Sequence, residues 1–136
     1  MTVSNEIILG IITLIIFLIL DFIWLKIIAD TIYQKFLGHM MAKKPNLKIA
    51  LIFYLIFIMG LMIFVIIPAL NQSSFRNILI YAPLFGLTTY ATFDLTSEAI
   101  FKDWPLAISI IDISWGIVLT TLTAILSYVI NINIIR

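Results

Sequence analysis

The sequence predicts an all-α, polytopic membrane protein with four transmembrane helices, and its composition carries this prediction. Hydrophobic residues make up 63% of the 136 residues, whereas charged residues make up only 11%, and the mean hydropathy is +1.21. Soluble domains usually carry about 25% charged residues, so this chain has too few to cover a water-facing surface. Residues 1–136 are therefore interpreted as a single membrane domain.

The first apolar segment covers about residues 7–29. It is long enough to cross a bilayer, since about 20 helical residues span the hydrocarbon core. No Lys or Arg precedes Lys26, and the segment is longer than the apolar core of a signal peptide, which has about 7–15 residues. We therefore expect it to be retained as a membrane helix.

A short amphipathic helix is expected next, over about residues 30–44. Its apolar residues recur at helical spacing on one face, and its polar residues take the other: Ile32, Tyr33, Phe36, Leu37, Met40 and Met41 against Gln34, Lys35, His39 and Lys43. A basic amphipathic helix beside a span is typical of the membrane interface. The alternative is a continuation of the first helix into water, with Gly38 marking a bend.

Three further spans are expected, at about residues 48–70, 77–97 and 105–130. The third contains Pro83, which a membrane helix tolerates because its neighbours satisfy the freed backbone groups. The fourth starts near Pro105, a favoured residue in a first helical turn, with Asp103 before it as a candidate cap. These spans and the first predict a bundle of four helices.

The basic residues are distributed asymmetrically about these spans. Six of the eight lie at one side of the membrane and two at the other: Lys26, Lys35, Lys43, Lys44, Lys48 and Lys102 against Arg76 and Arg136. By the positive-inside rule, the first and third connections are expected to face the cytoplasm. Both termini are then expected outside.

Three aspartates, Asp21, Asp94 and Asp112, lie within the apolar spans. Counting residues from the span ends places all three in the cytoplasmic half of the bilayer, on the helix faces expected to point inward. Candidate lining residues at this level are Trp24, Tyr54, Tyr90 and Trp115. Because a carboxylate in hydrocarbon is costly, such residues are by default a functional-site hypothesis.

The charge count favours proton or cation binding over simple packing. The only basic residue near the three acids is Lys26, and its long side chain can extend outward to the interface. Desolvation and mutual repulsion therefore predict that the cluster holds protons or an added cation. The alternative is that each aspartate only hydrogen-bonds to a neighbour within the bundle.

Four segments carry a resemblance to a known family. They are Asp21-Phe22-Ile23-Trp24, residues 90–97 (YATFDLTS), residues 102–105 (KDWP) and residues 112–116 (DISWG). In combination they resemble the small bacterial membrane proteins catalogued as domain of unknown function 2177, although Phe93 and Ser97 stand where Tyr and Asn are expected. The resemblance spans most of the chain. It implies a four-helix fold in a bacterial cytoplasmic membrane, and it implies no activity.

Three classes of function stay open. The first is a small coupled transporter or permeation subunit in which the aspartates carry the coupling proton or cation, and this class predicts a homo-oligomer. The second is an intramembrane enzyme that uses the aspartates as acid and base or as ligands of a divalent cation. The third is an assembly subunit that binds another membrane protein.

The sequence assigns no catalytic residue, metal ligand or cofactor, and a bound proton or cation is the one ligand considered. Cysteine is absent. The net charge is only +1, so nucleic acid is not expected as a partner. The lipid bilayer is the expected environment.

Overall fold

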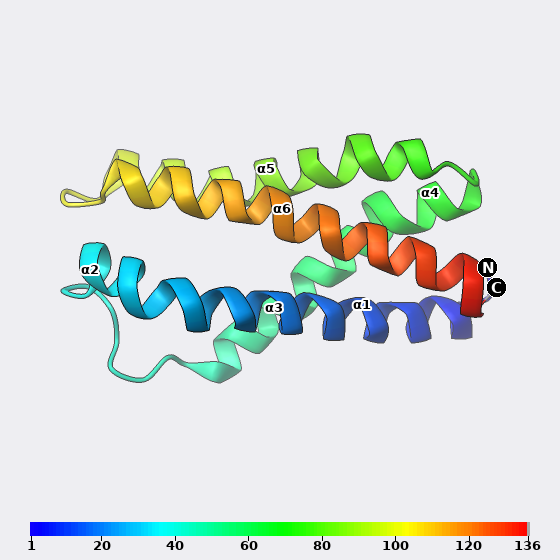
Figure 1. Ribbon diagram of the computed structural model, residues 1–136, viewed down its shortest axis with the longest axis horizontal. Coiled ribbons are helices and arrows are strands. Elements are labelled where there is room, and N and C mark those ends of the chain that lie inside the picture. Colours follow the sequence, from blue (N-terminus) through cyan, green and yellow to red (C-terminus); the bar gives the residue numbers. More distant parts are fainter. Residues whose placement is uncertain (136) are drawn as a thin grey trace.

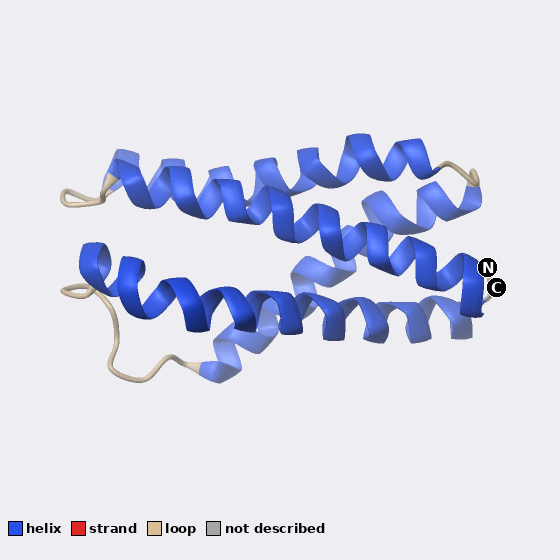
Figure 2. Cartoon of the chain, viewed as in Figure 1, coloured by secondary structure: helices blue, strands red, loops and turns tan. Residues whose placement is uncertain are grey.

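The chain is helical apart from its short connections, which confirms the all-α prediction (Figure 2). The computed structural model describes residues 1–135, with the backbone alone at Ala29. Four helical segments are long and apolar enough to cross a membrane: Val3–Ile28, Leu47–Asn71, Phe75–Ile100 and Leu106–Ile135. Each overlaps its predicted span, and the largest difference is at the end of the fourth, which continues to Ile135.

The first span begins at a capped turn. Helix α1 (Val3–Trp24) starts where the Thr2 hydroxyl accepts a hydrogen bond from the Asn5 backbone N–H, at 3.2 Å. The chain then continues without a break as a π-helix, η1 (Leu25–Tyr33), and a short helix, α2 (Gln34–Leu37).

The short helix between the first two spans was predicted, but it ends at Leu37 and not near residue 44. Pro45 restricts Lys44 to extended conformations, and residues 38–46 form turns and irregular structure. Because η1 joins this helix directly to α1, the arrangement is a continuation of the first helix. Its position relative to the membrane interface stays a prediction.

The second span is a composite of three helical pieces. Helix α3 (Leu47–Leu61) is capped by the Asn46 side chain, then a π-helix, η2 (Met62–Ile66), leads into α4 (Ile67–Asn71). Pro68 lies in the first turn of α4, where its missing N–H and its ring are accommodated. The change of helix type before Pro68 lets the span continue through a residue that would otherwise break it.

The third and fourth spans form a helical hairpin. Helix α5 (Phe75–Ile100) is capped by the Ser74 hydroxyl. Helix α6 (Leu106–Ile130) continues into a π-helix, η3 (Asn131–Ile135). Pro105 occupies the N-cap position of α6 and no side chain caps it, so the predicted Asp103 cap is wrong.

Helices α1, α5 and α6 run along the length of the molecule, and α3 crosses them obliquely (Figure 1). The α2–α3 and α5–α6 connections lie at one end, with the α4–α5 connection and both chain termini at the other. Helices α5 and α6 approach each other closely at two glycines, where a Cβ on Gly86 would lie 2.7 Å from the Gly116 carbonyl oxygen.

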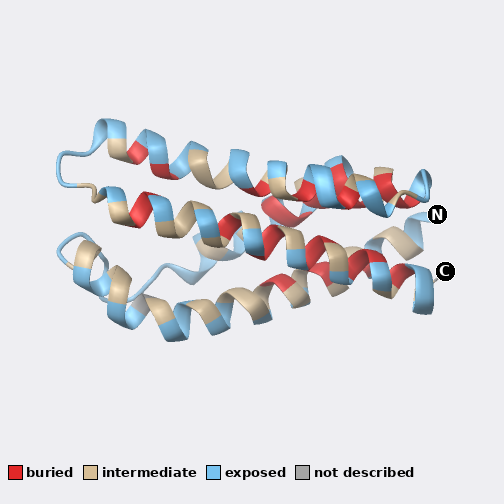
Figure 3. Cartoon of the chain, turned by 45° about the horizontal axis from the view of Figure 1, so that its top comes forward, coloured by how far each residue is buried: buried red, intermediate tan, exposed pale blue. Residues whose placement is uncertain are grey.

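The fully buried side chains lie mainly toward the end that holds the termini (Figure 3). They include Leu9, Phe17, Leu61, Ile66, Ile78, Leu119 and Ala124. At the other end α3 diverges from the remaining helices, so residues there have fewer neighbours. The outer surface carries many exposed Ile, Leu and Phe side chains, which suits contact with lipid.

Candidate functional site

Asp94 is the one aspartate that the bundle encloses fully, since none of its surface is exposed. It lies on α5, where Asp94 and Ser97 are buried among residues that face α6. Neither carboxyl oxygen of Asp94 has a hydrogen-bond partner, and the same holds for Oε1 of Glu98, one turn further along α5. A buried carboxyl without a donor is rare in folded proteins and calls for an explanation.

Asp112 lies on α6, close enough to Asp94 for the two carboxyl groups to interact electrostatically. Its Oδ1 accepts a hydrogen bond of 2.8 Å from the hydroxyl of Tyr33, which is supplied by η1. The same hydroxyl accepts a hydrogen bond of 3.1 Å from Nε1 of Trp24. Burial, together with the nearby Asp112 charge, raises the pKa of the Tyr33 phenol above its usual value, so Tyr33 stays a donor.

Asp21 lies on α1 and is satisfied by two other donors. The Tyr54 hydroxyl donates to Oδ2 at 3.2 Å, and Nε1 of Trp115 donates to Oδ1 at 3.1 Å. Tyr54 comes from α3 and Trp115 from α6, so this carboxyl joins three spans. Each carboxyl oxygen of Asp21 is therefore paired with a donor, which is the arrangement expected if an aspartate only hydrogen-bonds to its neighbours within the bundle.

A stacked pair of indoles separates these two groups of hydrogen bonds. The Trp24 and Trp115 rings lie parallel, with centroids 4.5 Å apart and planes 4° from each other. Trp24 donates toward the Asp112 side and Trp115 toward the Asp21 side. Because Trp115 follows Asp112 by three residues, about 4.5 Å along a helix, the two carboxyl groups occupy neighbouring levels of the bundle.

The aspartates form a pair and a neighbour, and not one closed cluster. Only Asp94 is fully buried, whereas Asp21 and Asp112 are half-buried. Among residues 1–135, no group of three or more His, Cys, Asp or Glu side chains is placed to hold a metal ion.

Tyr90 connects the helix packing to a pocket. Its ring lies directly over Gly116 of α6, where any Cβ would overlap it. The same side chain lines a pocket of about 450 Å³, together with Phe53, Phe57, Thr89, Phe93 and Asp112. Of the predicted lining residues, Tyr90 therefore lines a pocket with Asp112, while Trp24, Tyr54 and Trp115 act as hydrogen-bond donors.

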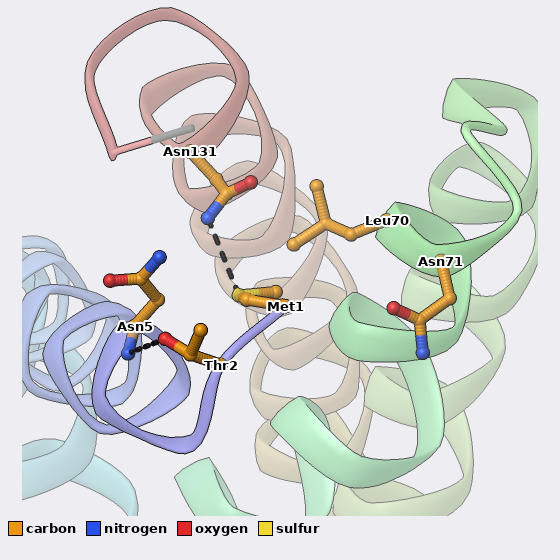
Figure 4. A pocket seen from close by; sticks show the side chains of 6 residues that line it. All are labelled: Met1, Thr2, Asn5, Leu70, Asn71 and Asn131. Carbon is orange, nitrogen blue, oxygen red and sulfur yellow. Dashed lines mark hydrogen bonds between the residues drawn. The ribbon is translucent and has the colours of Figure 1, made fainter.

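A larger pocket, of about 580 Å³, lies at the opposite end of the bundle (Figure 4). It is lined by Met1, Thr2, Asn5, Leu70, Asn71 and Asn131. Its polar groups are amides and a hydroxyl, and one amide, that of Asn131, already donates to the Met1 sulfur at 3.6 Å. None of the side chains that line this pocket is charged.

Tyr33 is a site residue that the sequence did not reveal, as are the pocket-lining Phe53, Phe57, Thr89 and Phe93. Its spacing with Ile32, Phe36 and Leu37 assigns it to the apolar face of a regular helix. In the structure it belongs to the π-helix η1, whose wider turn changes the direction of each side chain. A periodicity of 3.6 residues contains no signal of that change.

Four apolar spans packed around a largely hydrophobic core define the class: this is a multi-pass membrane protein, and lipid is its environment. The chain belongs to the family described as "Predicted membrane protein (DUF2177)", whose model matches residues 6–129. The resemblance seen in the sequence is thereby confirmed. No curated protein sequence and no solved structure matches the chain.

Proposed function

We propose that Asp94 and Asp112 together hold a proton or a cation, and that the protein is a small coupled transporter or permeation subunit. The observation that carries this proposal is the Asp94 carboxyl, which is fully buried, lacks any donor and lies beside a second carboxyl. Two adjacent carboxyls in a poorly solvated site cannot both be ionised without a compensating positive charge.

The donors around the aspartates do not supply that charge. They are two phenols and an indole, from Tyr33, Tyr54 and Trp115, and all three are neutral groups. Lys26, the basic residue nearest in sequence to Asp21, is exposed. Leaving a carboxylate uncompensated in the membrane interior costs several kcal/mol, so a bound proton or cation is the simpler solution.

The test is infrared difference spectroscopy of the purified protein in lipid nanodiscs between pH 4 and 9. Asp94→Asn is the informative variant, because an amide has nearly the shape of a protonated carboxyl. We expect the wild type to show a protonated carboxyl band that titrates in this interval, and Asp94→Asn to lose it. Asp103→Asn is the matched control, since Asp103 is exposed in the α5–α6 connection and its replacement should leave the band unchanged.

A spectrum in which every carboxyl is ionised at pH 5 without a bound cation would contradict the proposal. Hydrogen bonding to donors would then have to account for all three aspartates. The divalent-cation version of the enzyme alternative gains no support from the described part of the chain, because it contains no group of three or more potential ligands.

We further infer a bacterial cytoplasmic membrane, with the α2–α3 and α5–α6 connections inside. The supporting observation is that both connections lie at one end of the bundle and that six of the eight basic residues lie in or beside them. Alkaline phosphatase fused after the last residue should be active, and a fusion at Lys43 inactive. The reverse result would invert the orientation.

Four spans leave little room for a solute path within one copy, so we also propose that copies of the chain associate. Native mass spectrometry from mild detergent measures the copy number directly. A dimer or larger assembly is the expected result, and a lone chain would argue for a path within a single bundle. A different membrane protein retained in the complex would instead favour the assembly-subunit alternative.

A further inference from the structure

We propose that the pocket between α3, α5 and α6 binds a hydrophobic organic cation, with Asp112 as its counter-charge. This inference rests on the proposed function and names the substrate class of the same site. The pocket encloses about 450 Å³, a volume in the range that accommodates drug-sized molecules. Three features of the pocket indicate which kind of molecule it binds: the charge of its lining, the aromatic rings of its wall and the side from which it opens.

The lining charge is a single carboxyl group. Phe53, Phe57, Thr89, Tyr90 and Phe93 complete the wall, and none of these side chains is basic. Asp112 uses Oδ1 to accept from Tyr33, which leaves its second oxygen for another ligand. An anion would meet this carboxyl unfavourably, and a neutral lipid tail would leave it unpaired, whereas a cation neutralises it.

The aromatic rings suit a cation that is itself apolar. Four of the six lining residues are aromatic, and aromatic faces attract cations, most strongly where water is excluded. The rings also form a continuous wall, since Phe57 lies 5.8 Å from Phe53 and 6.2 Å from Tyr90, between centroids. A small hydrated ion would gain little from such a wall, so the size and polarity of the lining favour an organic cation.

Access is from the side of the bundle. Phe53 and Phe93 are 48% and 57% exposed, on the surface that faces lipid, whereas Phe57 is 5% exposed. Asp112, which is half-buried, lies on α6 on the inner side of this opening. A molecule that already partitions into the membrane can therefore reach the carboxyl without crossing the helices.

The neighbouring Asp94 allows cation binding in the pocket to be coupled to the release of a proton. In its apolar surroundings the pair of carboxyls is stable when its total charge is compensated, by two protons or by one proton and one cation. A cation that enters beside Asp112 thus takes the place of one proton, which leaves to solvent. If each bound cation displaces one proton, the affinity for the cation should fall by up to about tenfold for each unit decrease in pH.

Tetraphenylphosphonium is a suitable probe, and its binding to the protein in nanodiscs can be measured by equilibrium dialysis against empty nanodiscs. We expect saturable binding that is stronger at pH 8 than at pH 6. Asp112→Asn should weaken binding by at least about tenfold, because a charge-assisted contact is lost, while Asp103→Asn should leave it unchanged. Neutral triphenylphosphine oxide should bind no better to the wild type than to Asp112→Asn.

A second variant keeps the test informative should Asp112→Asn fail to fold. Phe93→Ala removes an aromatic wall residue at the rim and should weaken binding about threefold or more. Phe75→Ala is its matched control, because Phe75 packs on Tyr128 and does not line the pocket.

Equal binding to protein-containing and empty nanodiscs, or binding independent of pH and of both variants, would overturn the inference. Retention of a lipid in the pocket, seen by native mass spectrometry and unaffected by the probe, would overturn it in favour of an acyl chain. The two proposals fail separately. If the infrared band of Asp94 titrates but no cation binds, only the substrate class is wrong, whereas an absent band removes the proton site itself.

Discussion

The contact between Tyr90 and Gly116 makes replacement of Gly116 the sharpest test of how α5 and α6 pack. In Gly116→Ala the new methyl group would overlap three atoms of the Tyr90 ring. The ring cannot simply move aside, because its other side meets Phe57 edge to face, with centroids 6.2 Å apart. Gly10→Ala is the matched control, since a Cβ at Gly10 meets nothing within 4 Å.

The expected magnitude follows from two opposing terms. Exchanging Gly for Ala inside a helix stabilises by up to about 1 kcal/mol, and this term is common to both variants. Overpacking a tight contact costs about 1–3 kcal/mol, and it applies to Gly116 alone. We therefore expect Gly116→Ala to lower the free energy of unfolding by about 1–2 kcal/mol and Gly10→Ala to leave it unchanged or raise it.

Titration with a denaturing detergent in mixed micelles, followed by far-UV circular dichroism, measures both free energies of unfolding. The displaced Tyr90 ring should also narrow the pocket that it lines with Asp112, so probe binding should weaken with stability. Equal unfolding free energies for the two alanine variants would refute the close approach of α5 and α6. A destabilised Gly10→Ala would show that the control position is packed against a neighbour.

The remaining predictions concern hydrogen bonds in the bundle. Tyr33→Phe should lower the free energy of unfolding by about 1–3 kcal/mol, because it leaves the Asp112 oxygen without its donor, as detergent titration would show. Because the pKa of Tyr33 is raised in the folded state, the protonated phenol stabilises the fold fully below its pKa in the unfolded chain, about 10. This stabilisation of the fold falls as the pH rises further. In a pH series, Tyr33→Phe should therefore remove the loss of stability at alkaline pH. Thr120→Val should be neutral or stabilising in the same titration, because the buried Thr120 hydroxyl has no partner, whereas Thr13→Val should cost about 1 kcal/mol by losing its 2.8 Å contact with Ser127.

The four spans could be predicted because lipid imposes a simple rule on sequence. A segment that crosses the bilayer must be helical and apolar over about 20 residues. Three of these helices begin directly after Asn46, Ser74 and Pro105, which occupy their N-cap positions. The end of the short helix at Leu37 was not predicted. Apolar spacing continues to Met41, but the backbone leaves the helix before that pattern ends.

The three aspartates of the candidate site stand out in the sequence, whereas the geometry around them does not. Three acids in apolar segments stand out because placing a carboxylate in hydrocarbon costs free energy. Tyrosine and tryptophan side chains at the same depth can donate hydrogen bonds to them. Which acid is fully buried depends on how the helices pack, and hydropathy carries no information about that packing. Tyr33 reaches Asp112 through a π-helix, and a pattern based on 3.6 residues per turn does not detect it.

The parallel indoles of Trp24 and Trp115 have a consequence for observing this protein at work. Two of its three tryptophans lie 4.5 Å apart between α1 and α6, close enough for their electronic transitions to couple. Each donates to one of the two hydrogen-bonded groups that hold an aspartate. A rearrangement of either group would change the angle between the rings, and with it the circular dichroism of the indoles, so the chain carries its own optical reporter beside the carboxyls.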